Sequence, residues 1–496
     1  MIPEQEALIL LKQPDPAAMP LIPVYTWNKT FVRFESRRRK FSKQPWAQGV
    51  ILLACVIVAM LLANLPWTRD TYFHILETGL SIQVSSPDGG GFIFPAGMTV
   101  EKFINDILMV VFFFTVGLEI KREIVCGELS TPKKAVMPVI AALGGVLAPA
   151  LIYVLVNHGT AASSGWGIPT ATDIAFAVGI LSILGDKVPV SLKVFLTALA
   201  IADDLMAILV VALFYGGKIN FLLLGIALVL VLAIIFMNRM GEKRPWFYLI
   251  PAIVVWVLFY YSGIHATMSG VVMAFLIPMK PRYSKTYYFR KRKAFRTLIN
   301  EYETIHESGG FPNGPQRHVL RELSKTSRGC IGLSYQLEHA LAPWVNFVIM
   351  PVFALANAGV RIADPAYFNV FHFSPELGGV SMGIFLGLLL GKPLGITLAS
   401  YLAVKTKVAA MPDKATWRML LAVACLGGIG FTMSIFVDTL SFGDQAESVM
   451  LMLRDMGKVA VLMGSLCAGI LGSVLVLLSH KKVDSEVPDS PATQSN

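Results

Sequence analysis

The stretch LTALAIADDLMAILVVALFY, residues 196–215, is apolar almost throughout, yet Asp203 and Asp204 stand side by side in its middle. A run of this length can cross the roughly 30 Å hydrocarbon core of a bilayer as a single helix. Each charge at the centre of such a helix costs on the order of 2.5–3.5 kcal/mol on insertion scales. We therefore favour a functional pair of carboxylates over the structural alternative, in which one aspartate forms a salt bridge and the other a hydrogen bond.

The composition of the whole chain agrees with a membrane protein. Of 496 residues, 55% are hydrophobic and only 15% are charged, which is unusual for a soluble domain. Twelve apolar runs are long and uninterrupted, which favours helices over the short alternating strands of a barrel. The sequence therefore predicts an all-α membrane protein with twelve transmembrane helices. The predicted spans are residues 46–65, 103–120, 135–156, 168–184, 190–214, 221–237, 246–261, 265–279, 343–360, 380–402, 419–440 and 459–478.

Basic residues predict the orientation of these spans. They gather before the first span, at residues 37–43, and in every second connection, for example at 121–134 and 239–244. Because Lys and Arg are retained on the cytoplasmic side in short loops, we expect a multi-pass protein with both termini in the cytoplasm. The net charge of +10 then reflects topology, and nucleic-acid binding is a poor explanation for it.

The rest of the chain divides around this helical region. We expect a polar cytoplasmic N-terminal segment at residues 1–45, a twelve-helix membrane domain at 46–480 and a disordered cytoplasmic tail at 481–496. A basic cytoplasmic loop at 280–335 has the composition of a segment that contacts anionic lipid headgroups. No cleaved signal peptide is expected, because a full-length span follows the polar start.

Residues 81–94, SIQVSSPDGGGFIF, have the composition of a β-hairpin on the extracytoplasmic side. A lone hairpin is marginally stable in water, so we expect it to pair with another copy and form a homodimer.

Two spans contain residues that break helices. The fourth begins GWGIPTATDIAF (165–176), and the eleventh contains LGGIGFTMSIF (426–436). Exposed peptide groups at membrane depth are tolerable only inside protein or beside a wet cavity. If spans three to five and ten to twelve are two halves, the broken spans occupy corresponding positions. This is the pattern of an inverted-repeat transporter with its site where the breaks meet.

Other polar residues inside the membrane complete the candidate site. Asp173 follows Thr172 in the fourth span, where it can cap a half-helix, balance the charge near a cation, or do both. Lys392 lies in GLLLGKPLGI (387–396) and is the only basic residue that we place well inside a span. An ion pair between Lys392 and Asp203 or Asp204 is therefore expected. Glycines at 383, 387 and 391 allow the close helix packing that this pair requires.

Carboxylate, hydroxyl and carbonyl oxygens are hard ligands that suit Na⁺, Li⁺ or Ca²⁺, and no His or Cys cluster offers a zinc site. Burial disfavours a charged carboxylate whereas a neighbouring ammonium favours it, so such a pair can exchange protons. A site that holds either protons or a cation, but not both, is the site of an exchanger. We expect no enzymatic activity and no cofactor.

Several of these motifs resemble one family closely. They are FFFTVGLEIKREIVCGEL (112–129), IPTATDIAFAVGIL (168–181), ALAIADDLMAILVVALFY (198–215), LEHALAPWVNFVIMPVFALANAGV (337–360), LLLGKPLGI (388–396) and GIGFTMSIF (428–436). Together they resemble the NhaA family of bacterial Na⁺/H⁺ antiporters, in the expected order. Inverted repeats with two broken, crossing helices are a known property of that family, so the repeat argument and the resemblance are not independent.

The resemblance implies a function and a set of roles. The expected activity is electrogenic export of Na⁺, and of Li⁺, in exchange for more protons entering, by alternating access in the bacterial inner membrane. Asp203 and Asp204 would carry the cation and the protons, Lys392 would pair with the first aspartate, and Thr172 and Asp173 would belong to the crossed helices.

The resemblance also implies a pH-sensing cluster for pH homeostasis. Its members would be Glu119, Lys121, Arg122, Glu123 and Glu338. From the residues alone, these charges would be ordinary cytoplasmic flanks of the spans.

The long N-terminus and the basic loop depart from the family pattern, and the loop leads into Glu338, so the expected pH threshold is the least transferable property. Two alternatives stay open on the sequence: a transporter for another solute, and an intramembrane aspartyl protease. The protease is disfavoured because its Gly-x-Gly-Asp and Tyr-Asp contexts are absent.

Overall fold

The computed structural model describes residues 45–80, 82–85, 91–94, 98–217, 219–284, 286–291, 314–362, 365–371, 373–374, 378–413, 415–443 and 448–486. The predicted N-terminal segment, except for its last residue, and the last ten residues of the predicted tail lie outside these ranges, as do residues 292–313 of the basic loop. The described residues belong to two compact units. One unit lies within Arg282–Cys330 and includes α14 (Gly314–Gly329), and the other, the helical unit, comprises Pro45–Pro281 and the residues from Ile331 onward.

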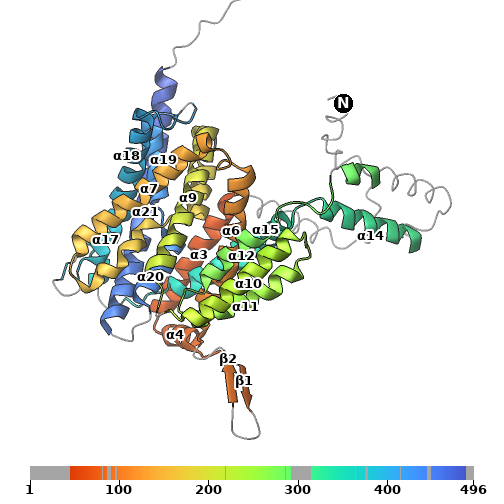
Figure 1. Ribbon diagram of the computed structural model, residues 1–496. Coiled ribbons are helices and arrows are strands. Elements are labelled where there is room, and N and C mark those ends of the chain that lie inside the picture. Colours follow the sequence, from red (N-terminus) through yellow and green to blue (C-terminus); the bar gives the residue numbers. More distant parts are fainter. Residues whose placement is uncertain are drawn as a thin grey trace, which may run out of the picture. The chain divides into compact units, whose positions relative to one another are not determined.

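The helical unit is built from long apolar helices and short connections (Figure 1). Its α-helices are α3 (Pro45–Asn64), α4 (Arg69–Glu77), α5 (Val100–Phe103), α6 (Met109–Cys126), α7 (Pro132–Asn157), α8 (Ile174–Ile183), α9 (Val190–Phe214), α10 (Phe221–Arg239), α11 (Trp246–Ser262), α12 (Thr267–Leu276), α15 (Leu333–Trp344), α16 (Met350–Asn357), α17 (Val380–Leu386), α18 (Lys392–Lys405), α19 (Trp417–Gly427), α20 (Phe431–Phe442) and α21 (Ser448–Glu486). Single π-helical turns join α5 to α6, α15 to α16 and α17 to α18, so each of these pairs forms one continuous span.

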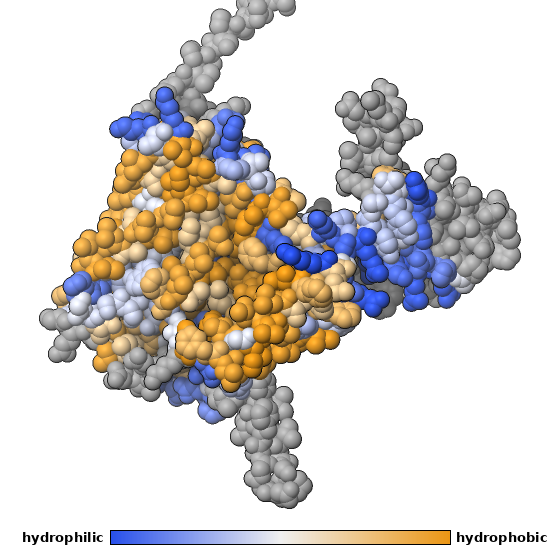
Figure 2. Space-filling view, viewed as in Figure 1, coloured by the Kyte–Doolittle hydropathy of each residue, from blue (hydrophilic) through white to orange (hydrophobic). Residues whose placement is uncertain are grey.

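The described residues contain eight helices that are long and apolar enough to cross a membrane, and up to ten spans if each of two bent helix pairs counts as one. The sequence prediction of a helical multi-span membrane protein is therefore confirmed. The two remaining predicted spans coincide with shorter apolar helices, α11 and α12. Hydrophobic residues cover much of the visible sides of the helices, as expected for a surface that contacts lipid (Figure 2).

Two spans begin ten residues earlier than predicted. The ninth span begins at Leu333 rather than 343, because Pro343 lies inside α15 and is followed by a π-helical turn at Val345–Ile349. The twelfth begins at Val449 rather than 459, because the helix continues through the charged residues 454–458, of which Arg454 forms an ion pair with Glu101. Its helix also continues to Glu486, into the predicted tail. Glu338 and Lys458 therefore lie within helices.

The fourth and eleventh spans are broken, as predicted. A 3₁₀ helix, η2 (Ala161–Thr170), meets α8 at a bend of 41°, and α19 meets α20 at a bend of 47°. Pro169 lacks a backbone N–H and ends the first half of the fourth span. Between the halves, Ala171 and Asp173 have extended backbones, which leaves peptide groups free to bind other elements.

The predicted hairpin is present as strands β1 (Ile82–Ser85) and β2 (Gly91–Phe94), which pair antiparallel with Ile82 opposite Phe94. It projects from one end of the helical unit (Figure 1). Its pairing with a second copy stays a prediction.

Close packing between α17, α18 and α7 positions the lysine predicted for the site. A Cβ atom at Gly391 would lie 2.8 Å from Cα of Pro149 in α7, and one at Gly387 would lie 2.7 Å from Cβ of Pro169. The backbones of Gly144 and Gly395 also touch directly. The predicted small-residue stripe therefore brings α18, which begins at Lys392, against the middle of α7.

We expect Gly391→Ala to destabilise the protein by about 1–3 kcal/mol, because the added methyl group must displace the backbone of α7. Thermal unfolding in detergent, followed by size-exclusion chromatography, measures this change. Gly225→Ala in α10 is the matched control, since nothing lies within 4 Å of its added Cβ. Equal melting temperatures for the two variants would show that the close approach is unimportant.

Candidate ion-binding site

The two predicted aspartates lie in the middle of α9, where each is only 3% exposed. Asp203 accepts a hydrogen bond from Nζ of Lys392 at a distance of 2.5 Å. Lys392 is fully buried and also contacts the hydroxyl group of Thr172. The residues alone left open which aspartate pairs with the lysine, whereas the resemblance implied the first one. The structure places the ion pair on Asp203.

The two helix breaks meet beside this ion pair. The backbone N–H of Asp173 donates to the carbonyl of Ile429 at 2.7 Å, and the hydroxyl of Thr172 donates to the carbonyl of Gly427 at 2.7 Å. These bonds satisfy peptide groups that the breaks leave free, and they fasten the fourth span to the eleventh.

Asp173 caps both half-helices that begin at the breaks. One carboxylate oxygen accepts from the N–H groups of Ala175 and Phe176 at the start of α8, at 3.1 and 3.3 Å. The other accepts from the N–H of Thr432 at 3.2 Å and from its hydroxyl. The capping role that the sequence suggested is therefore confirmed, and it extends to the start of α20, because a carboxylate balances the partial positive charge of two helix N-termini.

Asp204 faces a cavity instead of a basic partner. The cavity has a volume of about 300 Å³ and is lined by Asp204, Asp173, Thr172 and Thr432, and farther out by Glu119 and Glu338. The side chain of Glu119 is 40% exposed. The cavity therefore leads from a partly exposed acid to a buried one. Among the described residues, one carboxylate oxygen of Asp203 and one of Asp204 have no hydrogen-bond partner.

Four of the five residues predicted to sense pH form one cluster at the outer part of this cavity. Arg122 contacts Glu338 directly and lies 3.1 Å from Glu123 and 3.6 Å from Glu119. Lys121 does not join them. Its Nζ instead donates to the carbonyls of Phe275 and Ile277 at the end of α12, at 2.7 and 2.5 Å.

Sequence reasoning missed some polar residues. Thr432 lies inside the quoted motif GIGFTMSIF, where its spacing after three glycines marks the start of a half-helix. Asp438 lies within the predicted eleventh span and was overlooked because it is near the end of that span. Lys458 is 3% exposed within α21, so Lys392 is not the only basic residue inside a span.

Taken together, these features define a class of protein. Broken helices with their free peptide groups meet next to buried carboxylates, and a cavity reaches one of these carboxylates. This arrangement is characteristic of ion-coupled secondary transporters.

Comparison with known proteins identifies the family. Residues 39–476 match the family model described as Na+/H+ antiporter 1. A protein from Koribacter versatilis named Na(+)/H(+) antiporter NhaA is 40% identical over 481 residues, which cover 97% of this chain and 98% of the relative. Proteins of the same name from Wolinella succinogenes and Acidithiobacillus ferrooxidans are each 42% identical, over 86% and 90% of this chain and 89% and 98% of their own lengths. The chain belongs to the Na⁺/H⁺ antiporter family, and the resemblance noted in the sequence is confirmed.

Proposed function

We propose that this protein exchanges Na⁺ for H⁺ at Asp203 and Asp204. The observation that carries the proposal is the contrast between the two neighbouring carboxylates. Asp203 is bound to a buried lysine, whereas Asp204 faces a cavity that leads toward the exposed end of the span. A carboxylate pair with free oxygens is a hard-ligand site for Na⁺, and Li⁺ has the same ligand preference.

Competition at these carboxylates makes the transport an exchange. Na⁺ entering the site needs the carboxylate oxygens charged, and it must compete with Lys392 for Asp203. When the cation leaves, protons restore the neutrality of a site that is only 3% exposed, because an unpaired buried charge is costly. One proton binds Asp204, and a second returns Lys392 from the neutral amine to the ammonium form that pairs with Asp203. Two protons then enter for each Na⁺ released, which makes the transport electrogenic.

The fold supports an alternating-access mechanism. We count α11 and α12 as spans in addition to the ten above, which gives the twelve of the NhaA fold with inverted repeats and two crossing broken helices. The cavity reaches the site from the Glu119 end of α6. Transport then requires a second conformation in which the site opens toward the Glu101 end.

Asp204→Asn should abolish exchange while leaving the protein folded, because an amide occupies the same space and cannot release a proton. Asp203→Asn should abolish exchange and also destabilise the protein by about 3–5 kcal/mol, because it leaves the charge of Lys392 buried without a partner. The measurement is Na⁺-induced dissipation of a pH gradient in everted vesicles, together with thermal unfolding of the purified protein.

The double variant Asp203→Asn with Lys392→Met is the control that separates loss of stability from loss of exchange. It should regain stability without regaining exchange, because both members of the buried pair lose their charge together. Exchange at wild-type rates in both single variants would refute the site assignment.

We further propose that the cluster around Arg122 sets the pH dependence of exchange. The guanidinium group of Arg122 lies next to Glu119, Glu123 and Glu338, and two of these acids, Glu119 and Glu338, line the cavity. Lys121 is placed outside the cluster by its bonds to α12 and is expected to contribute less.

Arg122→Gln should move the pH profile of exchange toward alkaline pH by about one unit, because a carboxyl group at the cavity that loses a neighbouring cation holds its proton more tightly. Rates measured across a pH series with Na⁺ near saturation test this. Lys134→Gln is the matched control, because it removes a cation that is 59% exposed and is paired 3.5 Å from Glu128 instead of with the cluster. Identical profiles for wild type and Arg122→Gln would exclude a sensing role.

We also propose that the protein lies in the bacterial inner membrane with both termini in the cytoplasm and dimerises through the hairpin at residues 81–94. The basic connections support the orientation. Exposed backbone groups at the free edge of a two-stranded sheet can pair with a second copy.

A single substitution, Ser85→Cys, tests both the side of the membrane on which the hairpin lies and its part in the dimer interface. In intact cells it should react with a membrane-impermeant maleimide, and under oxidation it should give a disulfide-linked dimer. The native Cys126 is an internal control, because it is exposed at the opposite end of α6 and should react only after permeabilisation. Labelling of Cys126 but not of the hairpin in intact cells would show that the topology is the reverse of the one proposed.

A further inference from the structure

Besides Asp173, Asp203 and Asp204, a further buried aspartate, Asp438, lies in the half of the eleventh span that runs away from the candidate site. It is fully buried in α20, and neither of its carboxylate oxygens has a hydrogen-bond partner among the described residues. Its oxygen packs against Cα of Gly457 in α21, where any larger residue would occupy the same space. Gly457 therefore leaves room for the carboxyl group of Asp438, and no described residue donates a hydrogen bond to that group.

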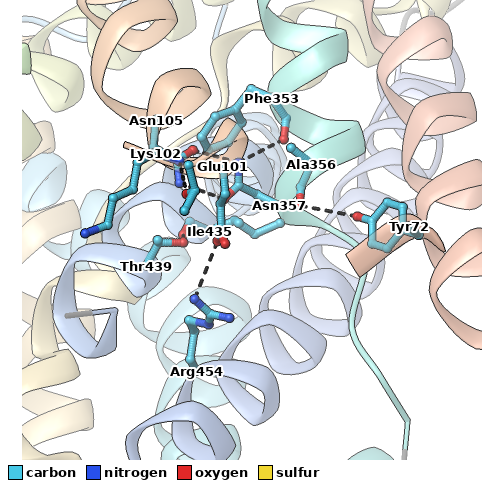
Figure 3. Close-up of polar contacts among 11 residues, drawn as sticks. Tyr72, Glu101, Lys102, Asn105, Phe353, Ala356, Asn357, Ile435, Thr439 and Arg454 are labelled. Carbon is cyan, nitrogen blue, oxygen red and sulfur yellow. Dashed lines mark hydrogen bonds and ion pairs between the residues drawn. The ribbon is translucent and has the colours of Figure 1, made fainter. Parts of the chain in front are cut away.

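Asp438 lies toward the membrane end opposite the cavity. The span Val100–Cys126 carries Glu119, which lines the cavity, and Glu101, which is 18 residues earlier and therefore about 27 Å away along the helix axis. Arg454 of α21 forms an ion pair with Glu101 at 3.5 Å, and Figure 3 shows its side chain directed toward that acid. Asp438 contacts Gly457 of α21, which is one turn after Arg454. Asp438 therefore lies near the Glu101 end of the span Val100–Cys126.

That end is closed in this conformation. Besides the ion pair, Asn105 and Asn357 exchange hydrogen bonds at 3.1 and 2.8 Å next to Glu101 (Figure 3). The hydroxyl of Tyr72 is bound to the carbonyls of Leu355 and Ala356. Asp438 is therefore shut off from both membrane faces, and it would become accessible only when the Glu101 end opens.

The charges around Asp438 select its ligand. Lys458, Arg454 and Asp455 of α21 lie within electrostatic range, as do the phenol groups of Tyr153 in α7 and Tyr215 at the end of α9. The charges of Lys458 and Arg454 repel a metal ion and also favour the charged form of Asp438, but neither residue donates a hydrogen bond to its carboxyl group. An unsolvated carboxylate without donors is costly to bury, and a bound proton removes that cost. The chemistry of the position favours a proton over Na⁺.

One buried hydroxyl group lies between Asp438 and the candidate site. Ser434 lies one turn earlier on the same face of α20, is fully buried, and donates a hydrogen bond to the carbonyl of Ile168 at 2.7 Å. One turn earlier again lies Gly430, at the break, and Thr432, two residues after it, binds Asp173. The distance along α20 from Asp438 to the meeting point of the two breaks is therefore about two turns.

We propose that Asp438 is a further proton-binding residue outside the candidate site, which takes up a proton from the Glu101 side when that side opens and retains it while that side is closed. This inference rests on the proposed exchange of Na⁺ for H⁺, because it assigns a route to the protons of that exchange. It assigns no Na⁺ binding to Asp438.

Asp438→Asn tests the proposal in proteoliposomes. The amide fills the same space next to Gly457 but carries no exchangeable acid proton, so Na⁺-driven proton flux should fall roughly 10- to 100-fold. Na⁺ binding at Asp203 and Asp204, measured as a Na⁺-dependent thermal shift, should be unchanged. Asp70→Asn is the matched control, because Asp70 is exposed on α4, which packs beside α5, and its removal should leave the flux as in wild type.

A purely structural role for Asp438, as a counter-charge for Lys458, predicts a different result. The double variant Asp438→Asn with Lys458→Met removes both charges and would then restore stability and flux together. A proton-binding role predicts that the double variant regains thermal stability while its flux stays low. Recovery of flux in the double variant would overturn the proposal.

Infrared difference spectroscopy gives a readout that does not depend on transport. The purified protein should show a protonated-carboxyl band that shifts in D₂O and is missing in Asp438→Asn but present in Asp70→Asn. Absence of such a band across the pH range in which the protein is folded would also overturn the proposal. If wild type itself showed no Na⁺-driven flux, the proposed function would fail while the infrared result would still decide whether Asp438 holds a proton.

Discussion

The ion pair between Asp203 and Lys392 is the interaction on which the rest of the site depends. An ammonium and a carboxylate that are both removed from water are stable only in direct contact, because either charge alone is costly to bury. Several features of the fold serve that contact. Glycines let α18 approach α7, the contact with Thr172 fixes the lysine, and a wide buried face of α9 accommodates two neighbouring acids.

This pair also explains why two adjacent aspartates can differ in chemistry. Neighbouring residues on a helix point about 100° apart, so one side chain can meet the lysine while the other faces the cavity. Asp203 has a fixed partner, whereas Asp204 is reached from the end of the span where Glu119 and Arg122 lie. The difference between the two sites comes from the neighbouring helices and not from the local sequence.

Much of this arrangement could be predicted from the sequence, because membrane depth makes polar residues conspicuous. Asp203, Asp204, Asp173 and Lys392 stand out in apolar runs, and glycines and Pro169 mark the breaks. Tertiary pairing could not be predicted from the residues alone. The choice of Asp203 over Asp204, which only the resemblance implied, and the separation of Lys121 from the acids depend on which helices face one another. Lys458 was missed because a group of charged residues in the sequence looks like the end of a span, whereas the helix continues through it.

The double cap formed by Asp173 has a consequence for the speed of transport. One carboxylate binds amides of α8 and of α20, so the two half-helices cannot separate without exposing both sets of amides. Any conformational change that separates α8 from α20 has to hydrate these groups, and that hydration is a barrier distinct from ion binding. The carboxylate of Asp173 therefore slows such a separation.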